Sequence, residues 1–82
     1  MPTAYFLLNV ALNHEAETIN EIKKILSAEK SIEYEIQGVF GVYDVIVKIK
    51  ADSDDAIRHL ALEKIKEIDK IQSAITMMVN QN

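Results

Sequence analysis

Apolar residues recur along this chain with two different spacings, which together predict strands and helices in alternation. Residues 5–10 form an almost wholly apolar run, which is typical of a strand covered on both faces. Residues 32–37 alternate Ile and Tyr with Glu and Gln, which predicts a strand with one solvated face. We expect a third strand at about 43–50, with Tyr43, Val45, Val47 and Ile49 on one face, and a last strand at 73–79.

Apolar residues spaced three or four positions apart predict two amphipathic helices between these strands. The first helix covers about 14–27, and Asn13 is its expected N-cap. The second begins after the polar run 52–55, which offers an N-cap and carboxylates for the first turn. Its apolar stripe predicts a regular α-helix about 24 Å long. The stripe consists of Ile57, Leu60, Ala61, Ile65 and Ile68.

The resulting order, β-α-β-β-α-β, predicts a ferredoxin-like α+β fold in a single domain spanning 1–82. Right-handed crossovers place both helices on one face of a four-stranded antiparallel sheet. Nothing in this chain covers the other face, although 5–10 and 74–79 are apolar on both of their sides. A bare face of that kind exceeds what monomers usually expose. We therefore expect a homodimer formed through this sheet face, an αβ-barrel or sandwich.

Composition narrows the classes of function. The chain has 13 Asp and Glu against 9 Lys and Arg, a net charge of -4, which argues against direct binding of nucleic acid. The absence of cysteine excludes disulfides and thiolate metal sites and fits a reducing cytoplasm. No apolar run approaches the roughly 20 residues that a membrane helix needs, and no basic region precedes the first strand. We expect a cytoplasmic protein with no nucleic-acid or membrane partner.

The side chains that usually carry catalysis or bind metals are scattered. His14 and His59 lack partners at metal-ligand spacing, and the serines have no nearby histidine. Two glycines are too few for a phosphate-binding loop. Glu33 and Glu35 share one strand face, which a solvated face explains. The sequence therefore predicts no enzyme, no metal centre and no cofactor.

The most distinctive local pattern is a hairpin, 39–50, that contains a glycine and an aspartate. Gly41 suits a tight reversal, and Asp44 falls where the chain re-enters the sheet and can accept backbone N–H groups. This hairpin end could hold a small zwitterion, and an ordinary hairpin with a capping aspartate is the alternative interpretation. The hydroxyl of Thr76, among apolar neighbours, needs a partner if it is buried. Thr76 either contacts a ligand or is simply a residue type that favours β-strands.

These segments resemble the effector domain, or RAM domain, of the Lrp/AsnC (feast/famine) transcription regulators in its stand-alone form. Residues 4–10 look like the first strand of that family. Residues 39–49 are similar to its glycine-x-tyrosine-aspartate hairpin. Residues 62–68, followed by Ile71 and Ser73, look like the second helix leading into the last strand. The resemblance therefore runs nearly from end to end.

The resemblance implies a prokaryotic module that binds a small-molecule effector, usually an amino acid, and whose dimers assemble into an octameric or decameric ring. By position, the effector site would comprise Gly41, Val42, Tyr43, Asp44, Ala74 and Thr76. Asp44 would bind the ammonium group of the ligand. Ala74 replaces the first residue of a threonine-x-threonine pair that is common in the family, so one hydroxyl contact is missing.

The regulators also carry a DNA-reading helix-turn-helix, which has no counterpart in this sequence. We therefore expect an effector-binding and oligomerisation module that can co-assemble with full-length Lrp/AsnC regulators. Two alternatives share the strand order: a small dimeric αβ-barrel enzyme of the monooxygenase or isomerase kind, and an ACT-like regulatory domain. The enzyme would need a polar cavity between helices and sheet, whereas the apolar stripes predict a solid core.

Overall fold

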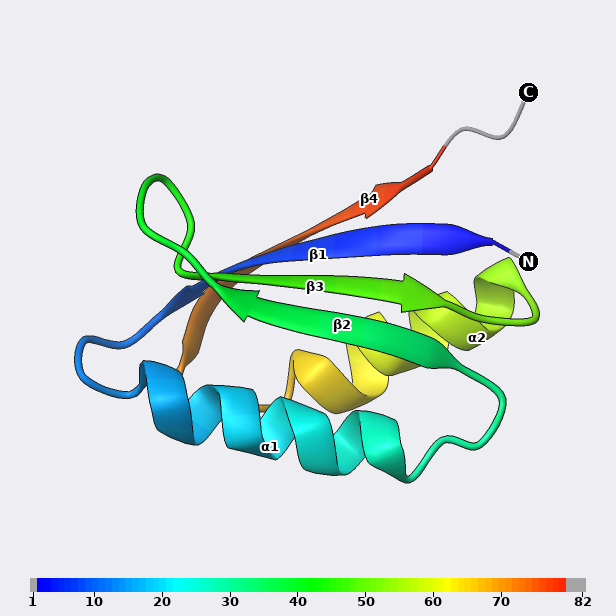
Figure 1. The fold of residues 1–82 in the computed structure, drawn as a ribbon, viewed down its shortest axis with the longest axis horizontal. Helices are drawn as coiled ribbons and strands as arrows, with labels where there is room; N and C mark the ends of the chain where they lie inside the picture. The colour runs from blue at the N-terminus through cyan, green and yellow to red at the C-terminus, as the bar shows by residue number, and fades with distance from the viewer. Residues whose placement is uncertain (1, 80–82) are drawn as a thin grey trace.

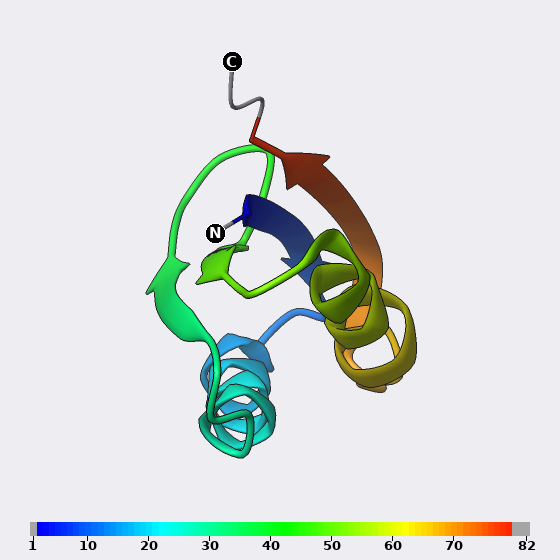
Figure 2. The same cartoon turned by 90° about the vertical axis from the view of Figure 1, so that its right-hand side faces the viewer.

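A computed structural model describes residues 2–79, in which an antiparallel sheet is covered on one face by helices (Figure 1). The elements follow in the order β1 (Thr3–Val10), α1 (Glu15–Ser27), β2 (Glu33–Gly38), β3 (Val45–Lys50), α2 (Asp54–His59), η1 (Leu60–Ile65) and β4 (Ile71–Met78). The four strands lie in the order β2-β3-β1-β4. Figure 2 shows the helical segments on the same side of the sheet. This arrangement confirms the predicted ferredoxin-like fold.

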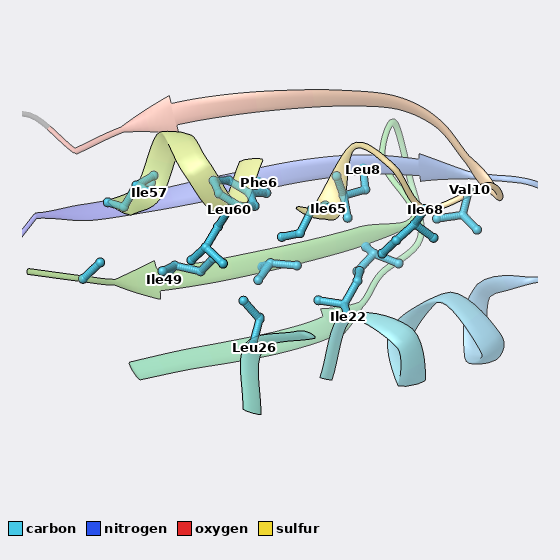
Figure 3. Packing of buried hydrophobic residues seen from close by; sticks show 14 residues of the cluster. Phe6, Leu8, Val10, Ile22, Leu26, Ile49, Ile57, Leu60, Ile65 and Ile68 are labelled. Carbon is cyan, nitrogen blue, oxygen red and sulfur yellow. The ribbon is translucent and has the colours of Figure 1, made fainter. Parts of the chain in front are cut away.

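The core lies between the sheet and the helices. Alternate residues of β1 and β3 point inward and meet the apolar stripes of α1 and of the α2–η1 segment (Figure 3). The largest buried apolar side chains of this layer are Phe6, Leu8, Ile22, Leu26, Ile49, Ile57, Leu60 and Ile65. Val45, Val47 and Ile49 are all buried, so the predicted face of the third strand is confirmed, although that strand begins at Val45 rather than at residue 43. The side chains of both predicted stripes therefore fill the interior.

The second helix starts where the sequence predicts but does not continue as a regular α-helix. Ser53 caps it, because its Oγ accepts a hydrogen bond from the Ala56 N–H at 3.1 Å. From Leu60 to Ile65 the chain forms a π-helix. The N–H of Lys66 donates to the carbonyl of Ala61, five residues earlier, at 3.2 Å. The wider turn buries Leu60 and Ile65 together, five positions apart.

The expectation of a regular α-helix was wrong for a physical reason. The stripe contains both Leu60 and Ala61, so Ile65 follows at a spacing of either five or four. Apolar spacing alone cannot separate these two geometries.

The start of the first helix also differs from the prediction. The helix begins at Glu15 with His14 as the N-cap, and no side chain caps it. Asn13 instead takes a φ of 68° in the preceding turn, a left-handed conformation that asparagine tolerates better than most residues. The Nδ1 atom of His14 lies 2.7 Å from Oε2 of Glu17, and this hydrogen bond lowers the pKa of Glu17 below its ordinary value.

Thr18 on α1 carries the one buried side-chain polar atom of the described residues that has no hydrogen-bond partner. Its Oγ1 lies in a residue that is only 1% exposed. We expect Thr18→Val to raise the free energy of unfolding by about 1 kcal/mol, because it replaces an unsatisfied hydroxyl with a methyl group of similar shape. Urea denaturation measures this change. A loss of stability would mean that the hydroxyl has a partner in solution.

Candidate functional site: the β2–β3 hairpin end and the last strand

The connection between β2 and β3, residues 39–44, projects beyond the sheet on the side opposite the helices (Figures 1 and 2). At its tip Gly41 has a φ of 140°, which disfavours residues with a side chain. A Cβ added to Gly41 would meet no atom within 4 Å, so the glycine is needed for its backbone conformation and not for space. Phe40 and Val42 on either side are exposed to solvent. The chain therefore reverses at this point, but through a six-residue connection and not the predicted tight turn, and the tip is apolar and uncovered.

Asp44 ties this hairpin to the neighbouring strand β1. Its Oδ2 accepts a hydrogen bond from the N–H of Val10 at 2.9 Å. Its own N–H donates to the carbonyl of Leu8 at 2.9 Å, and its carbonyl accepts from the N–H of Val39 at 2.9 Å. These three bonds join both ends of the hairpin to each other and to β1. The expectation that the Asp44 carboxylate accepts a backbone N–H is confirmed, and the residue is half-buried.

The other two predicted site residues, Ala74 and Thr76, lie on β4, on the far side of β1 from the hairpin. Ala74 pairs with Leu8, and Thr76 pairs with Phe6. Since neighbouring strands are about 4.8 Å apart, β4 lies about 10 Å from β3. Directly paired residues share a face, so Ala74 and Thr76 lie on the helix side together with the buried Phe6 and Leu8.

Ala74 and Thr76 are nevertheless exposed, because β4 is the edge strand of the sheet. The Thr76 hydroxyl therefore needs no partner within the chain. The hairpin tip projects to the opposite side of the sheet (Figure 2). One chain thus brings Gly41, Val42, Tyr43 and Asp44 together but does not bring Ala74 or Thr76 onto the same side.

A further polar pair, which the sequence analysis missed, lies at the same end of the sheet. The side-chain amide of Asn9 donates to Oγ of Ser73 at 3.0 Å across the β1–β4 pair. Asn9 stands between Leu8 and Val10, the two residues whose backbone groups bind Asp44. Asp44, Asn9 and Ser73 therefore form a polar row that runs from the hairpin end across β1 to β4. Only the β1–β4 register reveals this pair, since Asn9 and Ser73 are 64 positions apart in the sequence.

The open face of the sheet also carries charged residues from β2 and β3. Glu33 lies opposite Lys50, and Glu35 lies opposite Lys48. Two open hollows of about 240 Å³ and 220 Å³ lie along these strands. Both predicted glutamates are exposed, as expected of a solvated face. In residues 2–79 there is no group of three or more metal-capable side chains, and no helix long and apolar enough to cross a membrane.

Comparison with known proteins identifies the family of this domain. Residues 3–82 match the family model described as the Lrp/AsnC ligand binding domain. The chain belongs to this family. Regulatory protein AsnC of Escherichia coli (strain K12) is 43% identical over 42 residues, which cover 51% of this chain and 28% of AsnC. The match thus spans less than a third of the length of that regulator.

Solved structures of other proteins share the fold. The crystal structure of FFRP-DM1 matches with a TM-score of 0.81 and 30% sequence identity, covering 98% of this chain and 100% of that one. The transcriptional regulator NMB0573 of Neisseria meningitidis, solved as a complex with L-Met, matches with a TM-score of 0.73. It is 11% identical and covers 98% of this chain and 50% of that one, which shows a common fold alone. The predicted resemblance to the Lrp/AsnC effector domain is therefore confirmed.

Proposed function

We propose that this chain is a regulatory module that binds an amino acid and self-associates through its open sheet face. The observation that carries the proposal is the rigid hairpin end, in which Asp44 is held by three hydrogen bonds beside the Asn9–Ser73 pair. The family supports it, since its members are ligand-binding domains. The NMB0573 regulator, which shares the fold, was crystallised as a complex with L-Met.

The hairpin end has the chemistry that a zwitterion needs. A carboxylate at Asp44 attracts an ammonium group, and the backbone around Gly41, Val42 and Tyr43 offers N–H groups to a carboxylate. The Thr76 hydroxyl supplies a further contact. Because one chain places Thr76 and the hairpin tip on opposite sides of the sheet, the proposed effector site is built between chains, with the hairpin from one and β4 from another.

The open sheet face supports self-association. Leu7 pairs with Ile46 on β3 and with Ile75 on β4, and Tyr5 pairs with Met77. Ile75 is 46% exposed and Met77 is 50% exposed. Burial of apolar surface favours association at roughly 25 cal/mol per Å². We propose that a second copy covers this face, giving an αβ-barrel or sandwich dimer.

The exposed tip at Phe40 and Val42 supports the further assembly of dimers into a ring. Octamers or decamers are the proposed sizes. Co-assembly with full-length Lrp/AsnC regulators in the cytoplasm is the proposed setting. The net charge of -4 supports a module that acts through such partners and not by binding DNA itself.

The alternative function, a small dimeric αβ-barrel enzyme, finds less support. Such an enzyme needs a cavity between the helices and the sheet, and this space is filled by buried apolar side chains (Figure 3). Both hollows of about 240 Å³ and 220 Å³ are lined by residues of β1, β2 and β3 and by none of the helices. An ACT-like domain shares the topology, but the family match favours the Lrp/AsnC assignment.

A thermal-shift screen with the twenty amino acids tests the proposed function. We expect one amino acid, or a small group of similar ones, to raise the melting temperature in a concentration-dependent way, because a ligand that binds only the folded protein stabilises it. Light scattering on the same samples reports the size of the assembly. A folded monomer that responds to none of the twenty would contradict the proposal.

A further inference from the structure

The charges on the open sheet face are balanced, although the chain as a whole is acidic. Glu33 and Glu35 on β2 lie directly opposite Lys50 and Lys48 on β3. We refer to these four residues as the charge ladder. It contains two acidic and two basic side chains, whereas the whole chain carries a net charge of -4. This part of the surface is therefore close to neutral while the remainder is negative.

The Glu35–Lys48 pair begins a row of residues that crosses the whole open face from the edge strand β2. Lys48 is paired on its other side with Tyr5, and Tyr5 with Met77, so this row runs from the charge ladder into the apolar half of the face. Lys48 is half-buried, whereas the other three ladder residues are exposed. Glu35 and Lys48 both line each of the two hollows and so form the wall between them.

The charged ends of the ladder keep their hydrogen-bonding capacity. Within residues 2–79, the ion pairs closer than about 4 Å lie on the helical side, at His14–Glu17, Asp55–Arg58 and His59–Glu63. None of them joins two ladder residues. A protein surface that packs against this face can therefore form ion pairs with the ladder residues, or bring ladder residues of opposite charge together into ion pairs.

We propose that the Glu35–Lys48 pair selects the partner that covers the open face, and that this partner is a second copy of the chain. The inference rests on the proposed self-association through this face and adds how the partner is chosen. Two balanced ladders approach without the repulsion that a net charge of -4 would produce elsewhere on the surface. A wholly apolar partner would take both charges out of water and offer neither of them a hydrogen bond, which is unfavourable.

Removal of one charge at a time tests this inference. Lys48→Met leaves Glu35 without its opposite charge on a covered face, and we expect the dimer dissociation constant to rise by about 10- to 100-fold. The double variant Glu35→Met/Lys48→Met removes both charges, and we expect it to return to within about threefold of the unmutated value. Sedimentation equilibrium measures the constants, and circular dichroism verifies that each variant is folded.

Arg58→Met is the matched control. Arg58 lies 4.0 Å from Asp55 on the outer side of α2, where both side chains are largely exposed. We expect its removal to leave the dissociation constant unchanged. If Lys48→Met also leaves it unchanged, or if the double variant is as weak as the single one, the pair does not select the partner, and the inference fails while the proposed function stands. A monomeric unmutated chain would instead contradict the proposed function itself.

Discussion

Leu7→Asp is expected to dissociate the chain into folded monomers. Leu7 lies in the middle of the open sheet face, between Ile46 and Ile75, and outside the buried core. In a two-fold dimer the substitution places two unpaired carboxylates in the interface. At about 2–3 kcal/mol for each, the dissociation constant rises by roughly 1,000- to 20,000-fold. Light scattering over a range of protein concentrations measures the change.

Leu62→Asp provides the matched control for this experiment. Leu62 is 60% exposed on η1, on the helical side of the molecule, so the same substitution there adds a charge to a surface that the proposed dimer leaves open. We expect no change in its state of association. A Leu7→Asp variant that remains as tightly associated as the unmutated chain would show that the open face is not the interface.

Asp44→Ala is expected to weaken effector binding by about 10- to 100-fold, because a hydrogen bond to a charged group contributes roughly 1.5–3 kcal/mol. It is also expected to lower the free energy of unfolding by about 1–3 kcal/mol, since the N–H of Val10 loses its acceptor. Isothermal titration measures the first quantity and urea denaturation the second. Both quantities must be measured because the hydrogen bonds of Asp44 within the chain stabilise the hairpin, so a loss of stability alone says nothing about the effector.

Asp44→Asn separates these two roles. The amide oxygen can still accept the Val10 N–H, while the charge that would attract an ammonium group is removed. We expect this variant to be nearly as stable as the unmutated chain and to bind the effector about as poorly as Asp44→Ala. If neither variant alters binding while Asp44→Ala loses stability, Asp44 is a hairpin cap and has no contact with the effector.

Much of the fold could be predicted because its signals are local. Alternation over 32–37 and the helical stripe of Ile22 and Leu26 place their elements to within a few residues. Ser53 caps its helix as expected, because a serine hydroxyl just before a helix can accept an N–H of the first turn. The π-helix could not be predicted, because adjacent apolar residues at positions 60 and 61 satisfy both helical spacings.

Less of the candidate site than of the fold could be predicted from the sequence. That Asp44 accepts a backbone N–H was predicted correctly. The donor, Val10, belongs to β1 and lies 34 positions away, so the local pattern could not identify it. The Asn9–Ser73 bond depends on pairing between the first and last strands, which only the assembled sheet determines. The face on which Thr76 lies relative to the hairpin depends on that same register. Strand alternation alone shows only that Thr76 and Ala74 share a face.

The central claim is that an amino-acid site is built between copies of this chain, and association measured with and without effector tests it most directly. Sedimentation equilibrium would use the unmutated protein and the amino acid that gives the largest thermal shift. Because a ligand held by two chains binds their complex better than either chain alone, the effector is expected to shift the equilibrium toward dimers or larger assemblies. A chain that binds the amino acid as a monomer, with its association unchanged, would contradict the claim.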